Sequence, residues 1–146
     1  MKKLTVLLPL DGSEGSQLAI DTAKELLDKF EIHFKLLNVL DIRTKLTGYE
    51  EFDKLLNDRK TKASEEILSR AKEQLAGCEV TTDMDIGRPG ERIVAYIAKH
   101  PVDLIIMATQ NQSRVQRLLL GSVTNYVLSY SSKPVLAIPM KMPNHT

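Results

Sequence analysis

The sequence has no tryptophan and few phenylalanine or tyrosine residues. It contains a single cysteine, and its acidic and basic residues nearly balance. Because Cys78 has no second cysteine to pair with, an internally disulfide-bonded fold is excluded. Twenty basic and nineteen acidic residues give a net charge of +1, which offers no general attraction for nucleic acid or an anionic membrane. No stretch approaches the roughly 20 apolar residues of a membrane span. Proline and aspartate interrupt the apolar start at Pro9 and Asp11, so we expect a strand there, no signal sequence, and a cytoplasmic protein.

Residues that usually carry catalysis or bind metals are also scarce. The three histidines, His33, His100 and His145, are not spaced with cysteine or carboxylates as metal ligands are. No Ser-His-acid set is evident. The pair Asp83 and Asp85 alternates along a strand-like run, where we expect solvation and not chemistry. The sequence therefore predicts no catalytic site, and at most slow hydrolysis of any bound ATP.

Five short apolar runs are present, and amphipathic segments separate them. The runs predict strands at 4–8, 33–40, 80–86, 103–107 and 135–138. Apolar residues spaced by three and four predict helices at 13–30, 49–76, 89–99 and 122–130. In the long second helix the predicted inner stripe is Phe52, Leu56, Ala63, Ile67, Ala71 and Leu75. This alternation predicts one α/β domain over 1–146, with a parallel sheet covered on both faces and a flexible tail at 141–146.

The character of each run predicts the strand order. The third run alternates polar and apolar residues, as an edge strand does, whereas the first and fourth are continuously apolar, as central strands are. Right-handed crossovers then give the order 3-2-1-4-5, a Rossmann-like open sheet. The order reverses between strands one and four, and ligands of such sheets bind beyond the strand ends at that point. Pro9, Leu10 and Asp11 follow strand one, and Met107 to Asn111 close strand four.

Gly121 and Ser122 begin the last predicted helix. Ser122 is expected to cap it, and the glycine allows another molecule to approach the bare backbone. A helix start with free N–H groups is an anion site. The alternative is a plain turn and cap, and these residues taken alone favour that alternative.

A wider set of motifs carries a family resemblance. Met107-Ala108-Thr109-Gln110-Asn111 is followed by nine residues and then Gly121-Ser122-Val123, and Lys133-Pro134-Val135-Leu136 comes after them. With Pro9, Asp11 and Gly87-x-Pro89, the chain resembles the universal stress protein family over nearly its whole length. In that family the first motif reads Met-Gly-x-x-Gly, so Ala108 and Asn111 replace two glycines.

The resemblance implies an adenine-nucleotide site for ATP or ADP, with Mg²⁺ possible alongside the nucleotide. By position, Val39 would lie against adenine and Asp11 at the adenosine end. Ala108, Asn111, Gly121, Ser122 and Val123 would lie around the phosphates. Pro9, Leu10 and Met107 belong to the segments that meet at the same crevice. Val39 would equally be core in any such sheet, and Asp11 a turn cap. Restoring glycine at both 108 and 111 would remove two Cβ groups and admit positive φ, so we expect the double change to strengthen ATP binding.

Three functions follow from these residues. The first is a cytoplasmic signalling protein that binds ATP or ADP, and the second is a dimeric adaptor of the same family without nucleotide. An ATP pyrophosphatase of related architecture is the third, but residues 11–16 only loosely imitate its phosphate loop. In each stress-protein case we expect a homodimer through the apolar edge strand Val135 to Ile138, because unpaired edges associate. We expect no nucleic-acid or membrane partner.

Overall fold

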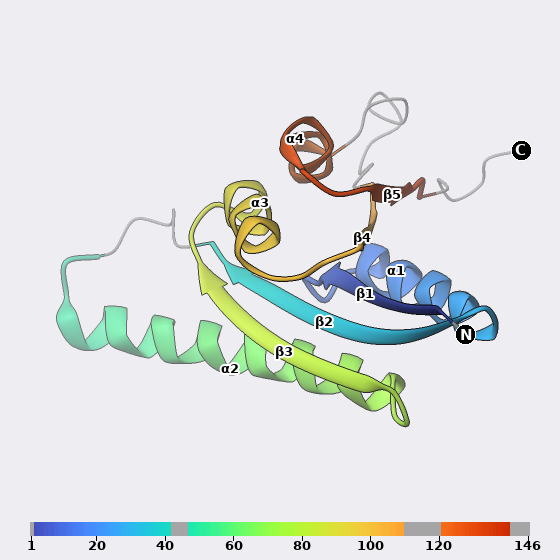
Figure 1. Cartoon of the computed structure of the whole chain (residues 1–146). Coiled ribbons are helices and arrows are strands. Elements are labelled where there is room, and N and C mark those ends of the chain that lie inside the picture. The colour runs from blue at the N-terminus through green and yellow to red at the C-terminus, as the bar shows by residue number, and fades with distance from the viewer. Residues whose placement is uncertain (1, 42–46, 110–120, 141–146) are drawn as a thin grey trace, which may run out of the picture.

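A computed structural model describes residues 2–41, 47–109 and 121–140 (Figure 1). The strands are β1 (Lys2–Pro9), β2 (Phe30–Leu40), β3 (Glu79–Ile86), β4 (Leu104–Ala108) and β5 (Val135–Ile138). The helices are α1 (Glu14–Glu25), α2 (Glu50–Gln74), α3 (Pro89–Lys99) and α4 (Ser122–Tyr130), and a short 3₁₀ turn, η1, covers Leu26–Asp28. All pairings are parallel and the strand order is β3-β2-β1-β4-β5, which confirms the predicted fold.

The core lies in two layers, one on each face of the sheet. On one face α1 and α2 pack on Leu8, Phe34 and Leu36. On the other face α3 and α4 pack on Leu7 and Leu37 of the same strands. Residues next to each other in sequence are therefore buried on opposite faces. This explains why β1 and β2 are continuously apolar.

The first helix is shorter than its apolar pattern predicts. α1 begins after Ser13, whose Oγ accepts a hydrogen bond from the N–H of Ser16 at 3.3 Å, and it ends at Glu25. We predicted a helix to about Phe30, but Phe30 pairs with Lys2 as the first residue of β2. Leu26 and Leu27 still pack against the core from η1, so apolar spacing alone did not mark the helix end.

The predicted stripe of α2 is wrong in the first half of that helix. The buried residues are Ser64, Leu68 and Ala71, whereas Phe52 is 50 % exposed and Ala63 is also exposed. Figure 1 shows the reason, because α2 extends beyond the carboxyl ends of the strands. Beyond the sheet, apolar side chains of this helix have no sheet residues to pack on.

Strand β3 is the predicted edge, but its polar face is not solvated as we expected. The hydroxyl of Tyr96 donates to Asp83 Oδ2 at 2.6 Å, and Arg92 Nε donates to Asp85 Oδ2 at 2.8 Å. Burial and then the contact with Asp83 raise the pKa of Tyr96, so its hydroxyl stays protonated and donates. Both carboxylates thus fasten α3 to the edge strand. The apolar residues Met84 and Ile86 are the exposed ones, at 43 % and 55 %.

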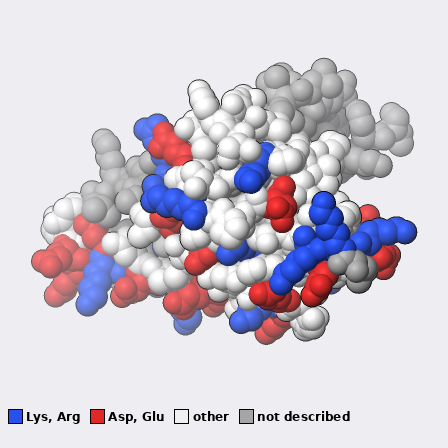
Figure 2. All heavy atoms as spheres, viewed as in Figure 1, with Lys and Arg blue, Asp and Glu red and all other residues white. Residues whose placement is uncertain are grey.

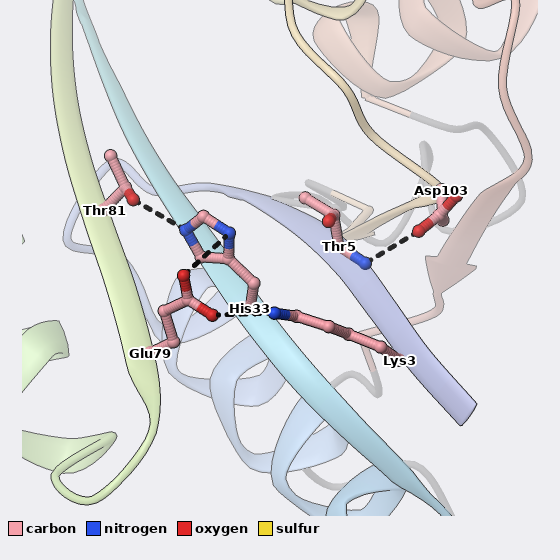
Figure 3. Close-up of polar contacts among 6 residues, drawn as sticks. All are labelled: Lys3, Thr5, His33, Glu79, Thr81 and Asp103. Carbon is pink, nitrogen blue, oxygen red and sulfur yellow. Dashed lines mark hydrogen bonds and ion pairs between the residues drawn. The ribbon is translucent and has the colours of Figure 1, made fainter. Parts of the chain in front are cut away.

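Polar contacts also fix the amino ends of the strands (Figure 3). His33 Nε2 lies 2.6 Å from Thr81 Oγ1, and Lys3 Nζ lies 3.3 Å from Glu79 Oε2, so β1, β2 and β3 are joined by side chains. The N–H of Thr5 donates to an oxygen of the Asp103 side chain at 2.8 Å.

The described surface carries mixed charge. On the face that Figure 2 shows, acidic and basic side chains are interspersed, and they are dense along the lower edge where α2 lies. This distribution agrees with the net charge of +1. In the described part of the chain, no helix combines the length and the apolar character needed to cross a membrane.

Candidate functional site

A cavity of about 320 Å³ lies where the strand order reverses. Its walls come from the carboxyl ends of β1, β2 and β4 and from the first turns of α1, α3 and α4. The residues predicted for a ligand site that line it are Pro9, Leu10, Asp11, Val39, Met107, Ala108, Ser122 and Val123. Its volume falls within the range of roughly 300–1,000 Å³ that is usual for ligand pockets.

Two of the ten predicted site residues are not in this lining. Gly121 precedes the lining residue Ser122 but does not itself face the cavity. Asn111 lies outside the described residues. Sequence reasoning missed other lining residues, which are Ser13, Gly15, Ser16, Leu37, Asp41, Pro89, Ile93 and Thr124. Position after a strand end could have indicated Asp41, but nothing local to the sequence indicates that α3 closes one wall.

Asp11 organises the turn between β1 and α1. Its Oδ1 accepts hydrogen bonds from the N–H of Ser13 at 2.9 Å and from Ser16 Oγ at 2.8 Å. The N–H of Asp11 donates in turn to Ser16 Oγ at 2.8 Å. One carboxylate oxygen of Asp11 therefore accepts hydrogen bonds within the turn, as expected if Asp11 caps that turn. The residue nevertheless lines the cavity, so the turn role and a ligand role are compatible.

The start of α4 corrects one prediction. We expected Ser122 to cap this helix, but Ser122 is its first helical residue and Gly121 is the N-cap. Gly121 has φ −59° and ψ 154°, so its glycine is not needed for a left-handed backbone. No side chain in the described ranges caps the helix. Within those ranges, the first-turn N–H groups of α4 have no side-chain acceptor at this wall of the cavity, where an anion would bind.

The other walls are apolar or acidic. Leu37, Val39, Ile93 and Met107 supply apolar surface, and the carboxylates come from Asp11 and Asp41. No lysine, arginine or histidine is among the lining residues that the structure describes. The cavity thus combines an apolar interior, carboxylates that accept hydrogen bonds from hydroxyl or amino groups, and one helix start that favours an anion.

Ala108, which stands in place of a family glycine, ends β4 in an extended conformation. A positive φ is therefore not needed there, contrary to one possibility raised by the sequence. A Cβ built on Gly15 would lie 3.2 Å from the Ala108 Cβ, so the methyl group of Ala108 faces the first turn of α1. The carbonyl of Ala108 accepts from Thr124 Oγ1 at 3.1 Å, which ties α4 to the end of β4.

The donor set does not form a metal centre on its own. Among the described residues there is no group of three or more histidine, cysteine, aspartate or glutamate side chains placed to hold an ion. Asp11 and Asp41 supply carboxylate oxygens, the donors that Mg²⁺ prefers, and a nucleotide's phosphates would have to complete its coordination.

A sequence model of the universal stress protein family matches residues 4–139. The chain belongs to the universal stress protein family. Universal stress protein MJ0577 of Methanocaldococcus jannaschii is 30% identical over 153 residues, which cover 93% of this chain and 94% of that protein. Universal stress protein MJ0531 of the same organism is 28% identical, with 91% and 80% coverage.

Solved structures of universal stress proteins share the fold. The structure of MJ0577 superposes with a TM-score of 0.83 at 32% identity and covers 94% of this chain and 96% of that one. UspA from Lactobacillus plantarum gives a TM-score of 0.79 at 22% identity, with 94% and 99% coverage. Two others were determined with nucleotides, a universal stress protein in complex with cAMP and an Arabidopsis thaliana family protein with AMP bound. At 22% and 15% identity, these two show only the shared fold.

Proposed function

We propose that this universal stress protein binds ATP or ADP in the cavity between β1 and β4 and acts as a cytoplasmic signalling protein. One observation carries the proposal: the start of α4, which no side chain of the described residues caps, lies in the same cavity as Asp11 and Asp41. A nucleotide has the matching parts, which are phosphates, ribose hydroxyls and a flat base. The cAMP and AMP complexes of other family members support the ligand class.

The arrangement supports a proposed place for each part of the nucleotide. Phosphate oxygens would accept hydrogen bonds from the N–H groups of Ser122, Val123 and Thr124, where the helix dipole also favours negative charge. The ribose would donate to Asp11, because hydroxyl groups donate to carboxylates. The base would lie on the apolar surface of Leu10 and Val39. The places of Asp11, Val39, Ser122 and Val123 match the positions that the family resemblance implies, and Leu10 and Thr124 are added because they line the cavity.

Calorimetric titration with ADP and ATP tests the proposal through the helix start. Ser122→Glu places a carboxylate beside the phosphate position, so we expect affinity to fall at least about tenfold, roughly 1.4 kcal/mol. The same change adds an acidic residue to the first turn of α4, which is favourable to the helix itself. Thermal unfolding should therefore show a folded variant of unchanged or higher stability.

Ser129→Glu is the matched control. It introduces the same charge on the same helix, but at an exposed position near the other end and outside the cavity. This variant should bind both nucleotides as the wild type does. Equal loss of affinity in the two variants would show that charge on α4, and not a phosphate site at its start, explains the effect. Absence of binding by the wild type would refute the proposal itself.

A dimeric adaptor without nucleotide is the second candidate function. It is favoured by the absence of a basic residue from the described lining and by the use of one Asp11 oxygen within its own turn. If the wild type shows no heat of binding with either nucleotide, this function takes the place of the first. The homodimer described next belongs to both functions.

We propose that β5 is the homodimer interface. Among the described strands it pairs only with β4, so one of its edges is open. Leu136 on this strand is 41 % exposed, and Leu128 and Tyr130 of α4 are exposed at 39 % and 63 %. A twofold axis beside β5 would pair the strand with its copy and cover these apolar groups together.

A further inference from the structure

A second cavity, of about 310 Å³, lies between α1 and α2. It shares Leu10, Asp11, Ser13 and Ser16 with the nucleotide cavity, so the turn after β1 is the wall between the two. Its floor is formed by Ile20, Ile67 and Ala71, and its rim by Gln17, Arg70 and Gln74. None of these six residues lines the first cavity.

Contacts on two sides fix the positions of the walls of the second cavity. Gly12 has φ +81°, and a Cβ built on it would lie 3.1 Å from Ile67 Cγ1, so the turn already rests against α2. Gln17 and Gln74 exchange hydrogen bonds at 2.6 and 3.1 Å and link α1 to α2. A ligand would therefore meet a preformed site and would not have to separate the helices.

The groups around the cavity define what it would hold. The lining residues Leu10, Ile20, Ile67 and Ala71 supply the apolar part of the cavity, where the apolar body of a ligand would lie. Within the described chain no ion pair or hydrogen bond engages the guanidinium of Arg70, which leaves its donors available for a carboxylate. Asp11 is the acid in the lining, and its Oδ1 accepts hydrogen bonds from the Ser13 N–H and from Ser16 Oγ within its own turn.

We propose that this second cavity binds a small carboxylic acid with an apolar body, and that Arg70 holds its carboxylate. Binding there restrains the turn of Asp11 from the side opposite the nucleotide. The coupling rests on the proposed function, because it requires that a nucleotide use the same turn. The two cavities share Leu10, Asp11, Ser13 and Ser16 as their common wall, so a ligand in either cavity packs against the same turn. Each ligand then raises the affinity of the other by the same factor.

Isoleucine methyl NMR with phenylacetate as the probe tests the cavity without any nucleotide. Ile20 and Ile67 line the second cavity and Ile93 lines the first, so their methyl signals report the two sites separately. We expect saturable shifts of Ile20 and Ile67, while Ile93 stays nearly unchanged. Phenylacetamide, which is neutral but similar in shape, should bind at least about tenfold more weakly, because it lacks the charge-assisted contact with Arg70.

Two variants of α2 make the test specific. Arg70→Gln should abolish the preference for the acid over the amide, and Arg59→Gln, on the exposed surface about three turns earlier, should keep it. Shifts that do not saturate, stronger response at Ile93, or an undiminished preference in Arg70→Gln would overturn the proposed site.

The coupling is tested by titrating ADP with and without saturating phenylacetate. We expect at least about a fivefold rise in ADP affinity. Unchanged ADP affinity would refute the coupling but not the site. If ADP does not bind at all, the proposed nucleotide function fails, whereas the methyl shifts still decide the carboxylate site.

Discussion

Single residues decide which polar groups of the cavity are free for a ligand. One oxygen of Asp11 accepts hydrogen bonds within the turn that the residue organises. In the part of the chain that the structure describes, no side chain accepts from the first-turn N–H groups of α4. Gly15 has a local effect as well, because it allows α1 to approach β4 closely at Ala108.

Ala108→Gly should destabilise the protein without improving nucleotide binding. The residue is 9 % exposed and lies in a strand, where glycine costs roughly 0.5–1 kcal/mol relative to alanine. Its methyl faces α1, so its removal creates no better fit for a phosphate. Urea unfolding and ADP calorimetry on the variant measure both effects. A gain in affinity would show that the family glycine at this position matters for the ligand.

Asp85→Asn should flatten the dependence of stability on acid pH. Burial alone would raise the pKa of Asp85, but hydrogen bonds from Arg92 and the N–H of Ile86 outweigh it and hold that pKa below its usual range. Because the folded-state pKa is lowered, the stabilisation is complete above the unfolded-state pKa of roughly 4. It is lost as the pH falls through the lower folded value.

The size of this effect is modest because the pair is partly exposed. At pH 7 we expect a loss of roughly 1 kcal/mol or less for Asp85→Asn. Between pH 5 and pH 2, unfolding free energies of variant and wild type should converge. Parallel curves over that interval would mean that Asp85 does not carry the lowered pKa.

At the scale of elements, sequence patterns predict buried strands better than half-covered helices. β1 and β2 could be predicted because both faces of each strand are buried. Such strands carry a continuous apolar run, and this pattern does not depend on which helices cover them. For α2 and β3 the pattern could not reveal how far the sheet extends or that Tyr96 and Arg92 lie above the strand. Likewise, most candidate site residues follow strand ends, but the wall that α3 supplies depends on tertiary packing.

The two halves of α2 should respond differently to mutation. Leu68 is 6 % exposed in the core, so Leu68→Ala should cost about 2–5 kcal/mol. Phe52 is 50 % exposed on the part of the helix beyond the sheet, so Phe52→Ser should change stability by less than about 0.5 kcal/mol. Guanidinium unfolding compares them directly. A large loss for Phe52→Ser would mean that this side chain is covered in solution.

For the whole molecule, we propose that an open edge of the sheet sets the assembly. Strands β3 and β5 are the two ends of the sheet. The carboxylates along β3 are held by α3, while its apolar residues Met84 and Ile86 remain exposed beside α2. β5 is instead short and apolar along its length, and exposed residues of α4 add to its apolar character. We therefore place the dimer contact at β5.

Leu136→Lys should convert the proposed dimer to a monomer. The side chain is 41 % exposed on the open edge strand, and a twofold contact would bring two lysines together in an apolar interface. Sedimentation equilibrium on wild type and variant measures the change, with Phe52→Lys as a control on another exposed apolar residue. A monomeric wild type, or a variant that remains dimeric, would contradict the placement at β5.

A crystal structure of the protein grown with ADP would show whether and where in the sheet the nucleotide binds. We expect phosphates within hydrogen-bond distance of the Ser122 to Thr124 N–H groups, the ribose beside Asp11, and adenine on Leu10 and Val39. A nucleotide bound at any other part of the sheet, or an empty cavity at saturating ADP, would contradict the proposed nucleotide site.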